Sequence, residues 1–192
     1  MPTFETIEVT PLKVSQSYLY PIMRVSGLSI TDSIRSYGAV FPLAILRILM
    51  GFMFLWAFFD EMFGLGYSTS SENAMINGGS PTEGFLRYGS DTLGWLADFF
   101  AVTDVIIMVA FMLLGFALIL GIGMKVATVG GTLLLIMMFI GVAPPTTNPL
   151  IDYHIIYIFL LMAIYLAHAE DLLGLGKHWK EMSIVKRCPI LE

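Results

Sequence analysis

Four long runs of apolar residues follow one another along this chain, and each approaches the length of a membrane-spanning helix. About 20 mostly apolar residues are needed to cross the hydrocarbon core of a bilayer. The runs cover residues 41–63, 102–120, 126–143 and 151–169. The pattern predicts an all-α fold, an integral membrane four-helix bundle that occupies residues 40–170.

The segments outside the bundle are more polar. Residues 1–39 include a short amphipathic stretch at 29–37, for which an interfacial helix and a loosely ordered tail are both open interpretations. Residues 171–192 form a basic tail. Lysine and arginine collect in the two ends and the second connecting loop, and the two opposite loops contain only Arg87. Because cytoplasmic loops retain positive charge, we expect both termini to be cytoplasmic and the protein to lie in the plasma membrane.

Composition supports a protein embedded in the lipid bilayer and excludes other classes. Of the 192 residues, 57% are hydrophobic and 13% are charged, whereas a soluble domain has about 25% charged residues. The net charge of -5 argues against nucleic acid as a partner. The single cysteine, Cys188, excludes an internal disulfide and an all-cysteine iron–sulfur site.

The end of the first span and the start of the fourth contain the candidate catalytic residues. An up-down bundle brings these ends to one rim, together with Asp104 at the start of the second span. Asp104 and Asp152 begin helices, where the dipole favours a carboxylate, so a structural role explains them well. Asp60 and Glu61 end an apolar helix, where the dipole opposes them, and such groups favour a functional site. The candidate catalytic set is Asp60, Glu61, Asp152 and His154.

The first outer loop, residues 64–101, contains a turn and a helix-start signal. Ser80 is placed as an N-cap and Glu83 as its capping-box partner, which predicts a short helix through residue 88. A helix N-terminus beside glycines and hydroxyls also suits an anion. Capping alone explains the motif equally well, and nearby acidic residues would repel an anion. The candidate substrate-binding residues are Asn77, Gly78, Gly79, Ser80, Thr82 and Arg87.

Two further patterns concern helix ends and intramembrane charge. A Gly-Leu-Gly or Gly-Ile-Gly triplet follows the first, second and fourth spans, and predicts C-terminal caps. Arg47 lies inside the first span. We expect it to have a structural role, either reaching the interface or pairing with Glu170 or Asp171.

One face of the fourth span combines histidine and tyrosine. His154 and His168 are about 21 Å apart by helical rise, so they cannot bind one haem iron; we predict no haem and no metal site within one chain. His154 with Tyr157 and a nearby carboxylate suits a quinone, whose carbonyls need donors and whose reduction consumes protons. The proton source would be His154 with Asp152 or Asp60. An aromatic belt at the membrane interface explains the residues equally well.

The ordered motifs resemble the DoxX/DoxD family of membrane proteins. The resemblance covers about residues 40–180 and lies in the segments 46–52 (LRILMGF), 59–69, 76–82, 148–155 and 173–179. It implies a DoxD-type subunit of a thiosulfate:quinone oxidoreductase, which oxidises thiosulfate on the outer side, passes electrons to quinone and works with a DoxA-like partner. Relatives commonly have a cation where this chain has Glu61, which weakens an anionic-substrate interpretation.

The alternative to a catalytic subunit is a non-catalytic membrane scaffold or partner for a redox-homeostasis enzyme. It is favoured by the absence of an intrinsic cofactor ligand set and by the basic tail. A homo-oligomer is a further arrangement that the sequence leaves open.

Overall fold

The computed structural model describes residues 30–88, 92–143, 145, 148 and 151–192. Within these residues every regular element is helical, which confirms the all-α prediction. The chain divides into two compact units, 1–39 and 40–192. The helices are α1 (Ile30–Phe63), α2 (Glu83–Tyr88), α3 (Phe100–Leu120), α4 (Met124–Val142), α5 (Tyr153–Leu166), α6 (Gly176–Glu181) and α7 (Ser183–Arg187). Short 3-10 turns lie at Ser71–Asn73, Met75–Asn77, Gly94–Phe99, Ala169–Asp171 and Pro189–Leu191.

Three of the helical segments are long and apolar enough to cross a membrane. They are Gly38–Phe63, Gly94–Leu120 and Met124–Val142. Large apolar side chains on these helices remain exposed in the isolated chain, among them Phe52, Leu113 and Val129. A soluble protein would bury such a surface, whereas lipid covers it in a membrane. The fold is therefore that of a membrane protein.

The fourth apolar helix is shorter than predicted. We expected a span over 151–169, but α5 has 14 residues and ends at Leu166. Its length is about 21 Å, against about 30 Å for the hydrocarbon core. His168 ends the helix with a left-handed backbone (φ 49°), after which Ala169 and Glu170 are buried. Hydropathy misses this end because the two alanines at 167 and 169 extend the apolar run until Glu170.

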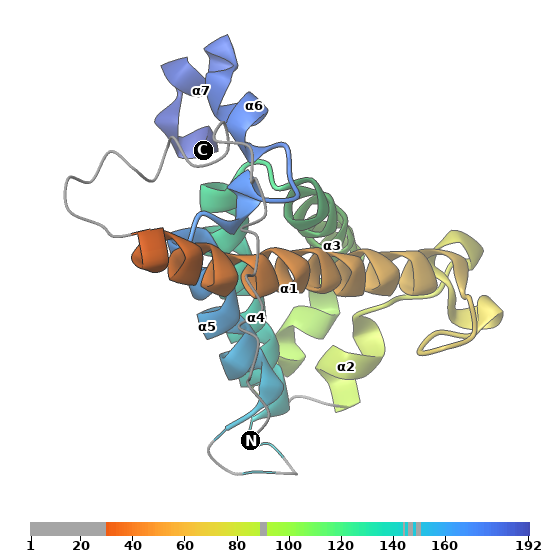
Figure 1. Cartoon of the computed structure of the whole chain (residues 1–192). Coiled ribbons are helices and arrows are strands. Elements are labelled where there is room, and N and C mark those ends of the chain that lie inside the picture. Colours follow the sequence, from red (N-terminus) through yellow and green to blue (C-terminus); the bar gives the residue numbers. More distant parts are fainter. Residues whose placement is uncertain (1–29, 89–91, 144, 146–147, 149–150) are drawn as a thin grey trace, which may run out of the picture. The chain divides into compact units, whose positions relative to one another are not determined.

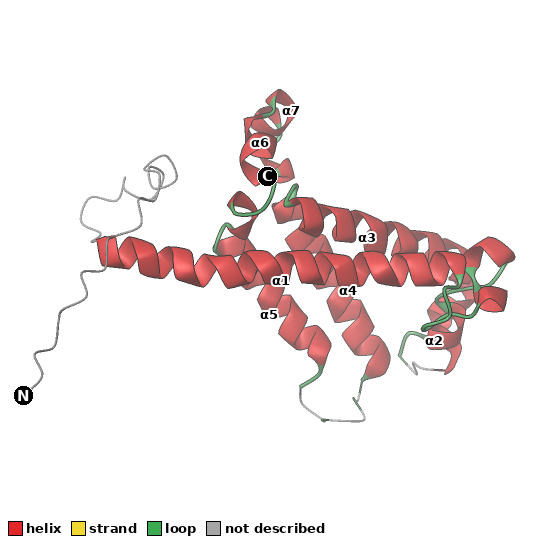
Figure 2. Cartoon of the chain, turned by 45° about the vertical axis from the view of Figure 1, so that its right-hand side comes forward, coloured by secondary structure: helices red, strands yellow, loops and turns green. Residues whose placement is uncertain are grey.

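Glycines set the closest helix contacts in the bundle. A Cβ added to Gly51 of α1 would lie 2.9 Å from the Gly115 carbonyl oxygen of α3. A Cβ on Gly131 of α4 would lie 3.1 Å from Leu114 and 3.2 Å from Leu161. These small residues let α1 approach α3, and let α4 approach α3 and α5. Figures 1 and 2 show α4 and α5 side by side.

The glycine caps follow the prediction at two of the three places. Gly64 and Gly121 have φ of 63° and 69°, and their amides donate to Asp60 and Ala117, as in left-handed C-terminal caps. The third triplet, residues 174–176, does not cap α5, because α5 ends eight residues earlier. Glycine is needed at position 176 because a Cβ there would lie 2.6 Å from Glu170 Cγ.

Arg47 completes the end of α3, and its predicted partner Glu170 lies close enough to attract the guanidinium. It is fully buried, and its guanidinium donates to the carbonyls of Leu118, Ile119 (3.1 Å) and Leu173 (2.8 Å). The last helical carbonyls have no partner within a helix. The carbonyl of Leu120 accepts from Leu175 (2.7 Å), so backbone and guanidinium together complete this end.

The predicted partner Glu170 also bonds to the C-terminal region. Glu170 is buried and accepts from Lys180 Nζ at 2.7 Å, and Asp171 accepts from the same ammonium at 3.1 Å. Burial acts to lower the pKa of Lys180, but the hydrogen bonds to Glu170 and Asp171 outweigh it and the pKa is raised. Trp179 Nε1 donates to the Leu191 carbonyl at 2.5 Å, so the basic tail is folded against itself.

Candidate functional site

Asp60 is buried at the end of α1 and is fully engaged by the loop that follows. Its carboxylate accepts hydrogen bonds from the amides of Tyr67 (3.3 Å), Ser68 (2.7 Å) and Thr69 (3.1 Å), and from the Ser68 hydroxyl (2.6 Å). These four hydrogen bonds stabilise the negative charge of Asp60, which the dipole at the C-terminus of α1 disfavours. This geometry gives Asp60 a structural role in folding residues 64–69 back onto α1. Its catalytic role stays a prediction.

Asp104 has a similar role for the outer loop. It is buried on α3 and accepts from the amide (3.0 Å) and the hydroxyl (2.6 Å) of Thr82. The Glu83 amide donates to Ser80 Oγ at 3.0 Å just before α2 begins. The carboxylate of Asp104 therefore lies at the start of α2, where the sequence predicts a bound anion.

The other candidate anion-binding donors also have partners within the chain. Asn77 Nδ2 donates to the Ser71 carbonyl at 2.6 Å, and the amides of Gly78 and Gly79 donate to Met75 and Ala74. Arg87 Nε pairs with Glu83 at 2.9 Å on the surface. These donors of the segment 77–87 are thus engaged by oxygen atoms of the chain itself, and anion binding by the segment stays a prediction.

Helix α2 is anchored on α4 through one aromatic ring. A Cβ on Gly141 of α4 would lie 2.2 Å from Cζ of Phe85, so only a glycine leaves room for this ring. Leu86 beside it is 2% exposed. The outer loop therefore forms part of the bundle wall.

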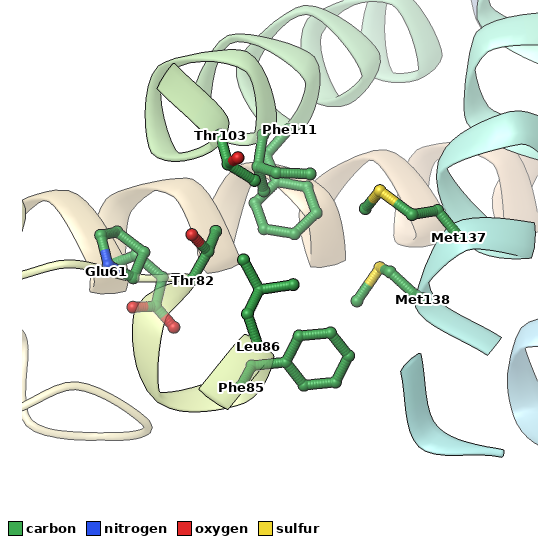
Figure 3. Close-up of a pocket in the computed structure, with 10 residues that line it drawn as sticks. Glu61, Thr82, Phe85, Leu86, Thr103, Phe111, Met137 and Met138 are labelled. Carbon is green, nitrogen blue, oxygen red and sulfur yellow. The ribbon is translucent and has the colours of Figure 1, made fainter. Parts of the chain in front are cut away.

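Glu61 faces a cavity behind α2. The cavity has a volume of about 220 Å³. Figure 3 shows Glu61 at one end and Met137 and Met138 at the other, with Phe85, Leu86 and Phe111 between them. Thr69 Oγ1 donates to Glu61 at 2.6 Å. Glu61 is the only ionisable side chain among the lining residues, which are Glu61, Pro81, Thr82, Phe85, Leu86, Thr103, Ile107, Phe111, Met137 and Met138.

A second cavity of about 170 Å³ is lined in part by His154 at the start of α5. Asp152 is the N-cap of α5; its Oδ1 accepts from the His154 amide at 2.9 Å and also bonds to His154 Nδ1. The other ring nitrogen, Nε2, is buried and has no hydrogen-bond partner in the described part of the chain. The lining residues are otherwise apolar or tyrosine: Met53, Phe54, Ala57, Phe111, Leu135, Met138, Tyr153, His154 and Tyr157.

The ionisable residues that were predicted to share one end of the bundle form two separate groups, one around Glu61 and one around His154. Asp60 and Asp104 lie close enough to Glu61 to repel its charge, whereas Asp152 and His154 form a separate pair. His154 lines its cavity together with Met53, Phe54 and Ala57 of α1, which lie one to two turns before Glu61. We expected all five groups at one level.

Phe111 and Met138 form the wall between the two groups, since both residues line both cavities. Sequence reasoning did not select either, because an apolar residue in a span has no distinguishing signal. Only the fold reveals that they separate Glu61 from His154.

Other chemistry is limited in the described segments. No three side chains of histidine, cysteine, aspartate or glutamate there gather as a metal-binding group. His168, the second histidine of the fourth span, lies at the opposite end of α5 and contacts Glu170 at 3.2 Å.

Comparison with family models, curated proteins and solved structures found no match. The resemblance to the DoxX/DoxD family therefore remains a prediction from the motifs.

Proposed function

We propose that this chain is a quinone-binding membrane subunit of a thiosulfate:quinone oxidoreductase-like complex. The proposed quinone site rests mainly on the environment of the His154 ring. Its Nε2 is buried without a partner in the described structure, and His154 is one of the residues that line an apolar cavity. A buried polar atom without a partner costs about 1–3 kcal/mol, and a ligand that bonds to it removes that cost.

A quinone head group has the complementary chemistry. Its flat ring suits a cavity lined by Phe54, Phe111 and methionine side chains. Asp152 bonds to Nδ1 of His154, which leaves Nε2 for the ligand. A doubly protonated ring donates from Nε2 to a quinone carbonyl, and a neutral ring accepts there from a quinol hydroxyl. His154 is thus suited to both redox forms.

Thiosulfate as the electron donor rests on the family resemblance. Two thiosulfate ions yield one tetrathionate ion and two electrons, and these electrons with two protons convert quinone to quinol. The loop 77–87 uses its donors within the chain, so we assign thiosulfate contact mainly to a DoxA-like partner. A plasma-membrane location with cytoplasmic termini belongs to the same proposal.

Quinone affinity tests the site directly. Purified protein in nanodiscs is titrated with decylubiquinone and with a short-chain menaquinone analogue. His154→Phe keeps an aromatic ring but lacks the hydrogen bond, and we expect it to weaken binding roughly tenfold, as for the loss of about 1.4 kcal/mol. His178→Phe, at an exposed histidine of α6, is the matched control. Failure of the wild-type protein to bind either quinone would contradict the proposal.

A scaffold for a redox enzyme is the second candidate. It is favoured by the exposed cations of the folded C-terminal segment, which are Lys177, Lys186 and Arg187. In that case His154→Phe leaves turnover of the purified complex unchanged. Charge reversal at the three cations would instead release the soluble partner.

A further inference from the structure

The cavity of Glu61 and the cavity of His154 are neighbours across a thin wall. Both are lined by Phe111 and Met138, one on α3 and the other on α4. Methionine has three rotatable side-chain bonds and adapts readily to a changing neighbour. Rotation of Met138 is therefore a route by which the two spaces connect.

The two cavities contain different acid–base groups. Glu61 is half-buried and so contacts both the solvent and its cavity, whereas His154 is 1% exposed. The ionisable neighbours of Glu61 are Asp60 and Asp104. Those of His154 are Asp152 and the phenols of Tyr153 and Tyr157.

Asp60 is poorly placed to pass protons, although the sequence offers it as a candidate. Its oxygens accept four hydrogen bonds from residues 67–69, and it does not line either cavity. Glu61 has one short hydrogen bond, from Thr69, and does line a cavity. Among the carboxylates of this end, Glu61 is thus the one with access to the interior.

From this arrangement we infer that Glu61 supplies protons from solvent to the quinone at His154. The inference rests on the proposed function. The His154 imidazolium transfers its Nε2 proton to a quinone oxygen as electrons arrive from the donor complex. A proton from the Glu61 carboxyl then moves along water that enters the first cavity from the solvent, past Met138, to Nε2, and solvent reprotonates Glu61. Two such cycles deliver the two protons that accompany two electrons in quinol formation.

The test measures proton uptake without the natural donor. Protein in nanodiscs with bound decylubiquinone is reduced by electrochemically reduced methyl viologen, whose oxidation releases no proton, and a pH indicator follows proton uptake in a stopped-flow instrument. We expect Glu61→Gln to bind decylubiquinone within twofold of the wild-type affinity but to take up protons at least tenfold more slowly. Glu61→Asp should restore most of the rate. Glu72→Gln, at an exposed carboxylate of the loop that follows α1, is the matched control.

A second variant keeps the test decisive if Glu61→Gln folds poorly. Thr103 lines the first cavity and not the second. Thr103→Phe should fill the proton route, slow proton uptake and leave quinone affinity unchanged. Wild-type proton-uptake rates in both variants, with quinone bound, would overturn the role of Glu61 and leave the quinone site intact. Absence of quinone binding by the wild-type protein would refute both.

Discussion

Replacing Arg47 by methionine tests the main polar contact of the bundle. The guanidinium is fully buried and donates to the carbonyls of Leu118, Ile119 and Leu173. Methionine fills a similar volume but leaves these three acceptors without the donor. Each buried acceptor without a partner costs about 1–3 kcal/mol.

An opposing contribution reduces the net effect. Removing a buried guanidinium also removes its desolvation cost, which is several kcal/mol. We therefore expect a net loss of about 3 kcal/mol, which lowers the unfolding temperature by roughly 6–12 °C. The unfolding temperature of Arg47→Lys should lie between those of the wild type and Arg47→Met, because one ammonium group cannot reach both the α3 carbonyls and Leu173.

Thermal unfolding in detergent, followed by the fluorescence of the three tryptophans, measures this shift. Arg87→Met is the control, because Arg87 forms an exposed ion pair with Glu83 and such pairs contribute about 0–1 kcal/mol. If Arg47→Met unfolds within about 2 °C of the wild-type protein, the assignment of these carbonyl contacts as a main stabilising element is wrong.

Three other changes have defined outcomes. Gly141→Ala places a methyl group 2.2 Å from the aromatic ring of α2. We expect the free energy of unfolding to fall by about 1–3 kcal/mol and the outer loop to be cleaved faster by protease. Gly130→Ala is the control, because nothing lies near the added methyl group. Because the pKa of Lys180 is raised from 10.5, its contribution to stability is complete below that pH and is lost as the pH rises through the higher folded value; Lys180→Met should abolish this alkaline component of unfolding curves. Asp60→Asn should loosen the following loop and increase its cleavage by protease, while Glu72→Gln should not.

The membrane-spanning helices could be predicted because their signal is local. A run of apolar residues of sufficient length is visible in any window of the sequence, and α3 and α4 lie where hydropathy predicts them. The early end of α5 could not be predicted in this way, since His168 turns the chain by a backbone conformation and not by a change of polarity.

The candidate site was predictable only in its polar members. Glu61 and His154 are unusual at the ends of apolar helices, so each is a visible candidate. The contact between Asp104 and Thr82 joins residues 22 positions apart and depends on how α2 docks. Phe111 and Met138 were not predicted because their importance lies in which cavities they separate.

Photolabelling tests the central claim, a quinone bound beside His154, most directly. Protein in nanodiscs is irradiated with an azido-ubiquinone, and the labelled peptides are identified by mass spectrometry. The account predicts adducts on α3 near Phe111 and on α4 near Met138, displaced by decylubiquinone and strongly reduced in His154→Phe. Labelling confined to the outer, lipid-exposed faces of the helices, or unchanged in that variant, would contradict it.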